Sequence, residues 1–333
     1  MARAPVTVVV PTYNSGHLIT DAINSLLAQT AQPEEIVVVD DGSTDDTAGR
    51  LAAYGSQIRY HRQPNRGVSA ARNLGLRHAR SELVAFLDAD DVWHPRKLQL
   101  QLDVLHRRHD LGLLGTCTYP WPAPDTPDVP EQPAVGRVAP VSWERLVVRN
   151  TVVTSSMVVR RSILNRVGEF DCLLQGPEDH DLWVRAAEVA GVANLELPLT
   201  GYRDTPASLG KQARRMEAGM RRIVAKVGER GGWRNRGLLR RKAYSIIDHR
   251  CAFMYSEAGE HAAAVWRSIR SLAGYPWPYR PEEQGTTFER GKRLVRSVFG
   301  VFYSRPRPPV PHEPREVTGR CSSSACSCSS PRS

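Results

Sequence analysis

The stretch Ser81–Asp91, SELVAFLDADD, constrains the fold of this chain most. It predicts a buried strand at Leu83–Leu87, and a strand that is apolar on both faces belongs inside a parallel sheet covered by helices. The strand stops at three carboxylates, Asp88, Asp90 and Asp91. Acids this close raise each other's pKa unless a cation lies among them. One interpretation is a hard divalent ion bound by these acids and by substrate phosphates. The other is a solvated acidic turn.

The predicted strand at 83–87 belongs to an alternation of strands and helices. Apolar, β-branched runs predict strands, and amphipathic stretches between them predict helices. The predicted strands are 6–10, 36–39, 58–61, 83–87, 111–118 and 154–159. The predicted helices are 17–29, a second helix that ends at Ala53, 65–79, 95–109, 143–149 and 162–167. This rhythm is typical of an α/β domain, with a mostly parallel central sheet flanked by helices.

Three of these strands end in polar residues, and parallel strands bring such ends to one edge of the sheet. Tyr13, after the first strand, offers a ring on which a base can stack. Asp40, after the second, can accept a hydrogen bond from a base or a ribose. Alternatively, Asp40 and Ser43 cap the second helix. The residues 65–67 that follow the third strand are either an ordinary turn or a close approach of backbone to a ligand at Gly67.

Four motifs follow one another in the first third of the chain: PTYN, VVVDDGSTDDT, NRGVSAARNLGL and FLDADD. Together they resemble family 2 glycosyltransferases of the GT-A fold, and the resemblance covers about residues 5–200. It implies a GT-A-type, Rossmann-like fold. It also implies inverting transfer of a sugar from a nucleotide-diphosphate sugar to an acceptor hydroxyl, in polysaccharide or glycoconjugate biosynthesis.

The same resemblance implies roles for residues at the donor side. A nucleoside pocket, one basic residue and three acids are expected there. Pro11, Thr12 and Tyr13 would line the nucleoside pocket, Asp40 would hydrogen-bond the base, Arg72 would lie near the base or phosphates, Asp88 would contact the ribose or sugar, and Asp90 would hold Mg²⁺ or Mn²⁺.

A second signature, EDHDLW at 178–183, resembles the ED motif on the acceptor side of the same family. The resemblance implies that Asp179 is the general base, with Glu178 beside it. A general base must lie within hydrogen-bond reach of the acceptor hydroxyl. One base and a single displacement give inversion. The alternative is a helix start rich in acids, which the helix macrodipole favours.

The chain is predicted to have three parts. Residues 1–203 form the nucleotide-sugar-binding and catalytic domain. Within it, 119–142 contain seven prolines and predict an irregular acceptor-side flap. Residues 204–303 form a basic helical region, with helices at 207–228, 237–258, 260–273 and 288–302. Residues 304–333 are rich in Pro, Ser and Arg and are predicted to be a disordered tail.

The net charge of +10 comes from the C-terminal part. Residues 203–333 hold 26 Lys and Arg against 11 Asp and Glu, a net charge of +15. Such asymmetry suggests a polyanionic partner, such as an anionic membrane surface. The stretch 288–302 gathers apolar residues on one face with cations around it, which suits a membrane interface or packing on the domain. These apolar residues are Phe288, Val295, Val298, Phe299 and Phe302.

Other features narrow the class of protein. No helix-turn-helix or RNA-binding signature is present, so no nucleic acid partner is expected. The start MARAP lacks the apolar run of a signal peptide, and the six cysteines lack C-x-x-C spacing outside the Ser-rich tail. We therefore expect a cytoplasmic protein that associates peripherally with the inner face of the membrane. The alternatives are a non-catalytic nucleotide-sugar-binding module and a sugar nucleotidyltransferase, although PTYNSGH lacks the lysine of a nucleotidyltransferase loop.

Overall fold

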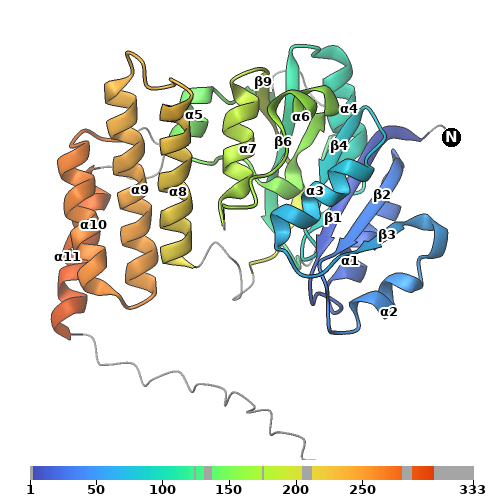
Figure 1. Cartoon of the computed structure of the whole chain (residues 1–333), viewed down its shortest axis with the longest axis horizontal. Helices are drawn as coiled ribbons and strands as arrows, with labels where there is room; N and C mark the ends of the chain where they lie inside the picture. Colours follow the sequence, from blue (N-terminus) through green and yellow to red (C-terminus); the bar gives the residue numbers. More distant parts are fainter. Residues whose placement is uncertain are drawn as a thin grey trace, which may run out of the picture.

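The computed structural model describes residues 3–123, 125–130, 137–174, 176–204, 212–279 and 287–303. The strands are β1 (Ala4–Thr12), β2 (Pro33–Asp40), β3 (Arg59–Arg62), β4 (Leu83–Phe86), β5 (Val92–Trp93), β6 (Leu111–Pro120), β7 (Val138–Pro140), β8 (Val158–Arg160) and β9 (Gly191–Tyr202). They form one nine-stranded sheet in the order β3-β2-β1-β4-β8-β6-β9-β5, with β7 paired to β9 (Figure 1).

The two halves of the sheet differ in strand direction. β3, β2, β1 and β4 are parallel neighbours, as predicted. In the other half, β8 runs antiparallel to β4 and β6, and β5 and β7 run antiparallel to β9, while β6 and β9 are parallel. The expectation of a mostly parallel sheet holds for β1–β4, whereas in the other half only the β6–β9 pair is parallel. An apolar run predicts a buried strand, but the connections decide its direction.

The proline-rich stretch 119–142 is more regular than predicted. β6 continues through Tyr119 and Pro120, and β7 lies inside the stretch. Proline is tolerated there because Pro120 ends its strand and Pro140 lies on a strand that pairs on one side. Residue 124, residues 131–136 and the predicted tail at 304–333 lie outside the described residues, so the acceptor flap and the disordered tail stay predictions.

Helices cover both faces of the parallel half. The helices of the first two thirds of the chain are α1 (Ile19–Leu27), α2 (Thr47–Ala52), α3 (Val68–His78), α4 (Lys97–Arg107), α5 (Trp143–Val148), α6 (Arg161–Val167) and α7 (Glu178–Ala187). Because side chains alternate along a strand, Val8 packs with α1 and α4 whereas Val9 packs on the opposite face. Gly75 of α3 lies directly over Val9; a Cβ there would come within 2.3 Å of Val9 Cγ1. Both faces are therefore buried, which explains the unbroken apolar runs.

Four further helices follow the sheet: α8 (Ala213–Glu229), α9 (Gly237–Glu257), α10 (His261–Gly274) and α11 (Thr287–Tyr303). They confirm the four helices predicted for this region, and they stand as a row beside α5 and α7 (Figure 1). Ile223 of α8 and Ile246 of α9 belong to the same buried cluster as Trp183 of α7. One core therefore runs through both predicted regions, and the domain boundary at residue 203 stays a prediction. None of the described helices is long and apolar enough to span a membrane.

Candidate active site

The ends of β1, β2 and β4 meet at one edge, as predicted. Thr12 of β1 is level with Asp40 of β2, and Val9 of β1 is level with Phe86, two residues before Asp88. Pro11 and Thr12 are buried, and Thr12 Oγ1 has no hydrogen-bond partner within the described part of the chain. The side chain of Tyr13 is 48% exposed, so its ring is open to a ligand.

The loops after β1 and β2 hold one another in place. The Asn14 backbone N–H donates to Ser43 Oγ at 2.9 Å, and the Thr44 N–H donates to Asn14 Oδ1 at 2.8 Å. Asn14 adopts a φ of 48°, in the left-handed region that asparagine tolerates best after glycine. The exposed ring of Tyr13 is therefore presented by a loop whose backbone is fixed by its neighbour.

Asp40 is fully buried, and both of its carboxylate oxygens accept hydrogen bonds from protein groups. Its Oδ1 accepts from the Ser43 N–H and its Oδ2 from the Tyr60 hydroxyl, both at 2.7 Å. Burial and this hydrogen bond to Asp40 raise the pKa of Tyr60 to about 12. The contacts cap the turn after β2, whereas the second helix, α2, begins only at Thr47. The predicted contact of Asp40 with a base stays a prediction, and it would have to displace one of these donors.

The neighbouring acid, Asp41, orders the start of α3. Its carboxylate accepts from the Arg66 N–H at 2.9 Å and the Gly67 N–H at 2.7 Å. Gly67 has a φ of 87°, and a Cβ placed on it would meet nothing within 4 Å. Glycine is thus needed at 67 for its backbone conformation, as in an ordinary turn, and this turn positions α3 and its Arg72.

Arg72 connects the donor edge to the second motif. It is 4% exposed, its Nη2 donates to Asp88 Oδ1 and its Nη1 to Glu178 Oε1, each at 2.7 Å. The guanidinium also lies 5.4 Å from the centre of the Phe170 ring. A planar fork between two carboxylates gives directional as well as charge-assisted bonds. This bridge brings the end of β4 and the start of α7 together, 90 residues apart in sequence.

The acids after β4 are crowded and only partly compensated. Burial and repulsion by Asp88 raise the pKa of Asp90 to about 6 and that of Asp91 to about 8. Asp91 is 2% exposed and accepts from Ser155 Oγ at 2.6 Å and from the Arg203 N–H at 3.0 Å. Ser155 and Arg203, which the motifs did not reveal, therefore hold the acids in position.

The residues present fit a divalent cation. Asp88 keeps 30% of its side chain exposed, and Asp90 is also partly exposed. Two carboxylates that repel each other are the oxygen ligands that Mg²⁺ and Mn²⁺ prefer. In the described ranges, no group of three or more His, Cys, Asp or Glu side chains is arranged to hold a metal ion. An ion on Asp90 would therefore complete its coordination with water or with oxygens of a substrate.

Asp179 lies in the first turn of α7 and is held by two side chains. Its Oδ2 accepts from Thr154 Oγ1 at 2.9 Å and from Asn150 Nδ2 at 3.1 Å. Asp179 is partly exposed, whereas Glu178 is 4% exposed and is bonded to Arg72. Burial raises the pKa of Glu178. Of the two acids, Asp179 is thus the one that an incoming hydroxyl can reach.

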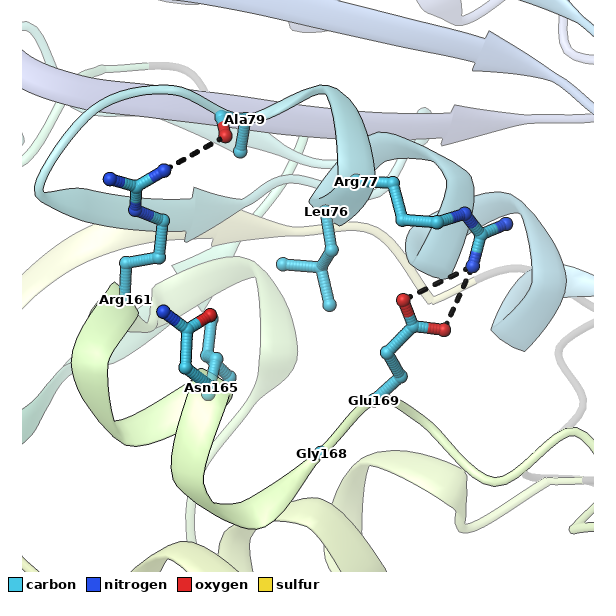
Figure 2. Close-up of a pocket in the computed structure, with 8 residues that line it drawn as sticks. Leu76, Arg77, Ala79, Arg161, Asn165, Gly168 and Glu169 are labelled. Carbon is cyan, nitrogen blue, oxygen red and sulfur yellow. Dashed lines mark hydrogen bonds and ion pairs between the residues drawn. The ribbon is translucent and has the colours of Figure 1, made fainter.

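A separate hollow of about 270 Å³ lies at the C-terminal end of α3, against α6 (Figure 2). The Arg77–Glu169 ion pair, at 2.8 Å, crosses one side of it, and Arg161 Nη1 donates to the Ala79 carbonyl on the other. None of the predicted site residues lines this hollow. The candidate site is therefore the strand edge with Asp179.

Comparison with known families agrees with this geometry. Residues 7–163 match the family model described as Glycosyl transferase family 2. They belong to glycosyltransferase family 2. The match includes the donor edge, from β1 to the acids after β4, and ends before the second motif at 178–183.

Known relatives of this glycosyltransferase domain resemble it over part of their length. An uncharacterized glycosyltransferase of Rickettsia typhi is 28% identical over 191 residues, which are 56% of this chain and 60% of that protein. The Escherichia coli protein WfgD, named as a UDP-Glc:alpha-D-GlcNAc-diphosphoundecaprenol beta-1,3-glucosyltransferase, is 29% identical over 185 residues, 54% of this chain and 68% of that protein. The chain thus spans about three fifths of the length of the Rickettsia relative.

Solved glycosyltransferase structures share the fold. A mannosyltransferase of Pyrobaculum calidifontis, in complex with GDP-Man and Mn²⁺, aligns with a TM-score of 0.55 at 20% identity, over 92% of this chain and 89% of that one. Staphylococcus aureus TarS 1–349, in complex with UDP-GlcNAc, aligns with a TM-score of 0.52 at 18% identity, over 81% and 89%. These likenesses confirm the GT-A fold predicted from the four motifs.

Proposed function

We propose that this protein is an inverting glycosyltransferase that moves a sugar from a nucleotide-diphosphate sugar to an acceptor hydroxyl, in polysaccharide or glycoconjugate biosynthesis. The observation that carries the proposal is the Arg72 bridge. It joins Asp88, at the donor edge, to Glu178, the neighbour of Asp179. A transferase needs the leaving group and the base within one substrate's reach of each other, and this bridge holds their two elements together.

The donor side fits a nucleotide-sugar. Tyr13 presents an open ring for base stacking, and the buried Thr12 hydroxyl lacks a partner in the described structure, so it can bond a ligand. The E. coli relative is named for UDP-Glc, and two structures of the same fold hold UDP-GlcNAc and GDP-Man. These names support a nucleotide-diphosphate sugar as the class of donor here.

Asp90, with Asp88 beside it, would hold a Mg²⁺ or Mn²⁺ ion, and a bound ion of this kind neutralises charge on a leaving diphosphate. The protein's own contribution is to keep these acids in place. Ser155 Oγ bonds Asp91 and accepts from the Asp88 N–H at 3.1 Å. Arg203 Nε donates to the Asp90 carbonyl at 3.1 Å. These contacts fix the acid turn before a substrate arrives, so little reorganisation is needed.

At the acceptor side, Asp179 removes the proton of the attacking hydroxyl. Thr154 and Asn150 bind its Oδ2 and so orient the carboxylate, and the His180 N–H donates to its Oδ1 at 2.6 Å. With one base and one displacement, the new bond forms on the face opposite the leaving diphosphate, which inverts the anomeric centre. Glu178 acts on the position of Arg72 and not on the acceptor.

A thermal-shift screen of nucleotide-sugars, with and without Mn²⁺, tests the donor side. A donor should raise Tm as expected for a stabilisation of RT ln(1+[L]/Kd). In Asp90→Asn, the extra shift caused by Mn²⁺ should disappear while the metal-free shift by the nucleotide remains. A chain that no nucleotide-sugar stabilises, with or without the ion, would contradict the proposed function.

The outer face of α10 and α11 suits peripheral placement on an anionic membrane. Trp266 and Ile269 of α10 are 57% and 45% exposed, and Val295 and Phe299 of α11 are 53% and 58% exposed. The exposed cations Lys292 and Arg296 lie on the same helix as the last two. Apolar anchors next to cations bind anionic lipid interfaces. This placement would bring the enzyme to the inner face of a membrane.

A further inference from the structure

Tyr202, the last residue of β9, lies beside the acids that follow β4. The antiparallel pairing of β5 with β9 ends with Val92 opposite Gly201, so the next position along the two chains places Tyr202 opposite Asp91. Residues opposite each other in such a pair carry their side chains on the same face. The Arg203 N–H donates to Asp91 Oδ1 at 3.0 Å, so the two chains stay together beyond the last pair. The backbone therefore places Tyr202 at the acid turn.

On its other side, Tyr202 is held by β6. The Trp121 N–H donates to the Tyr202 carbonyl at 2.9 Å, and Pro120 is level with Tyr202 in the parallel pair of β6 and β9. The preceding residue, Gly201, packs closely against the same strand, since a Cβ on it would come within 3.0 Å of Tyr119 Cζ. The backbone that carries the tyrosine ring is therefore ordered from both sides before a ligand binds.

The hydroxyl of Tyr202 is open to a ligand. The side chain is 41% exposed, and within the described ranges its hydroxyl forms no hydrogen bond. Tyr60, which is also exposed, differs in this respect, because its hydroxyl donates to Asp40. Burial, followed by the carboxylates of Asp91 and Asp90, raises the pKa of Tyr202. The hydroxyl therefore keeps its proton at neutral pH and can donate it to an acceptor.

Two arginines at the site are already bonded to acids. Arg72 lies between Asp88 and Glu178, and Arg203 Nη2 donates to Asp21 Oδ2 at 3.1 Å. An anion drawn to the acid turn by a cation would therefore meet carboxylates and occupied guanidinium groups. The phenol hydroxyl beside them is an open, neutral donor, and it can bond a phosphate oxygen without adding a charge.

We propose that Tyr202 binds the diphosphate of the nucleotide-sugar through a hydrogen bond from its hydroxyl. The inference rests on the proposed function, since it takes the diphosphate and its ion to lie at Asp88 and Asp90. Tyr13 would then contact the base at one end of the donor, and Tyr202 the phosphates at the other. The two exposed tyrosines would thus bind opposite ends of one ligand.

The test is isothermal titration of wild type and Tyr202→Phe with UDP and with GDP, each in the presence of Mg²⁺. The change removes one hydroxyl and keeps the ring. The nucleotide that wild type binds more tightly should bind the variant about 10- to 100-fold more weakly, the range for a hydrogen bond to a charged group. Tyr244→Phe, in α9, is the matched control and should change nothing. Equal affinity of wild type and Tyr202→Phe would overturn the proposal.

Inorganic pyrophosphate with Mg²⁺ separates a contact with the phosphates from a contact with the nucleoside. Its affinity should fall by a similar factor in Tyr202→Phe, because it carries neither base nor ribose. A loss for the nucleotide without a loss for pyrophosphate would place the hydroxyl at the nucleoside and overturn the proposal.

Tyr202→Leu separates the hydroxyl from the ring. It should weaken nucleotide binding about as much as Tyr202→Phe does, and a loss confined to Tyr202→Leu would indicate stacking of the ring and overturn the hydroxyl contact. Failure of the proposed function gives a different result. Wild type that binds neither UDP, GDP nor pyrophosphate with Mg²⁺ would contradict both proposals, whereas nucleotide binding that is equal in wild type and Tyr202→Phe contradicts the inference alone.

Discussion

Two clusters of buried charge in this molecule are built in opposite ways. Between α8, α9 and α10, Glu217 and Asp248 face Arg221 and Arg267, and every acid has a basic partner. The bond from Arg221 and the other nearby donors outweigh burial and lower the pKa of Glu217. At the end of β4 the acids crowd each other instead, and the pKa of Asp90 is raised to about 6.

The difference separates charge that stabilises the fold from charge that awaits a ligand. A buried ion network whose members are all paired is satisfied by the chain itself. Crowded acids lower stability until something of opposite charge binds, which is why perturbed groups gather at functional sites. The acid edge is joined through Arg72 to the first turn of α7, which carries Asp179.

The largest effect is expected at Asp179, which we count among the charged groups that await a ligand. Asp179→Asn should lower turnover about 10²- to 10⁴-fold while donor binding survives, because the general base is lost and the donor edge is untouched. The matched control is Asp181→Asn in the same helix. Asp181 pairs with Arg185 and Lys226, so this change should lower Tm and leave the turnover of folded enzyme nearly intact. Retained turnover in Asp179→Asn would remove it from the role.

The same change, Asp to Asn, should affect stability differently in the two clusters. Asp248→Asn leaves Arg221, Arg267 and Arg270 without their shared acid and should lower the free energy of unfolding by about 3–5 kcal/mol. Asp90→Asn relieves repulsion and should not lower it. Urea unfolding of both variants measures the contrast. Equal destabilisation by the two changes would show that the acid edge is as well compensated as the helical network.

The part of the site that could be predicted consists of residues inside local motifs. Asp88 and Asp90 directly follow an apolar run, so the end of a strand and its chemistry are visible in one window of sequence. Asp179 was assigned differently, from the resemblance of EDHDLW to a motif of the family, and its role as the base stays a prediction. The separate roles of the adjacent acids Asp40 and Asp41 could not be predicted from sequence, because the two side chains contact different elements. Asp40 accepts from Tyr60 of β3, and Asp41 accepts from the turn before α3.

The part that could not be predicted comes from contacts between distant elements. Thr154 and Ser155 lie in a 3₁₀ turn, Thr154–Ser156, inside what reads as a continuous strand, and this turn aims them at Asp179 and Asp91. Arg203 reaches Asp91 from the end of β9, a strand that the periodicity did not reveal. Such partners are set by packing, which leaves no local signal.

The surface of the helical region also carries charge beside exposed apolar side chains. If its outer face meets anionic lipid, Trp266→Glu or Phe299→Glu should reduce binding to phosphatidylglycerol vesicles about tenfold or more, since each change removes a large apolar anchor. Leu238→Glu is the matched control, because Leu238 is 65% exposed on α9 and belongs to neither α10 nor α11. Co-sedimentation measures the effect, and an equal loss in all three variants would contradict a specific face.

Lys97 is an exception among the buried charges of this fold. Lys97 is fully buried with no acid within hydrogen-bond reach in the described structure; its Nζ donates to Gln101 Oε1 at 2.8 Å and lies 3.7 Å from the centre of the Trp93 ring. Burial lowers the pKa of Lys97 well below its usual value of 10.5. Lys97 lies outside the proposed site, so Lys97→Met should leave turnover unchanged.

The pH dependence of stability distinguishes a neutral Lys97 from a charged one. Because its pKa is lower in the folded state than in the unfolded chain, the unfolded chain binds the extra proton, and wild type should gain stability as pH rises from the folded pKa toward 10.5. The gain relative to Lys97→Met should be at most about 1.4 kcal/mol per pH unit. Urea unfolding of both proteins at several pH values measures this slope. A difference that does not vary with pH would mean that Lys97 stays charged, and uncompensated charge would then no longer mark ligand sites in this fold.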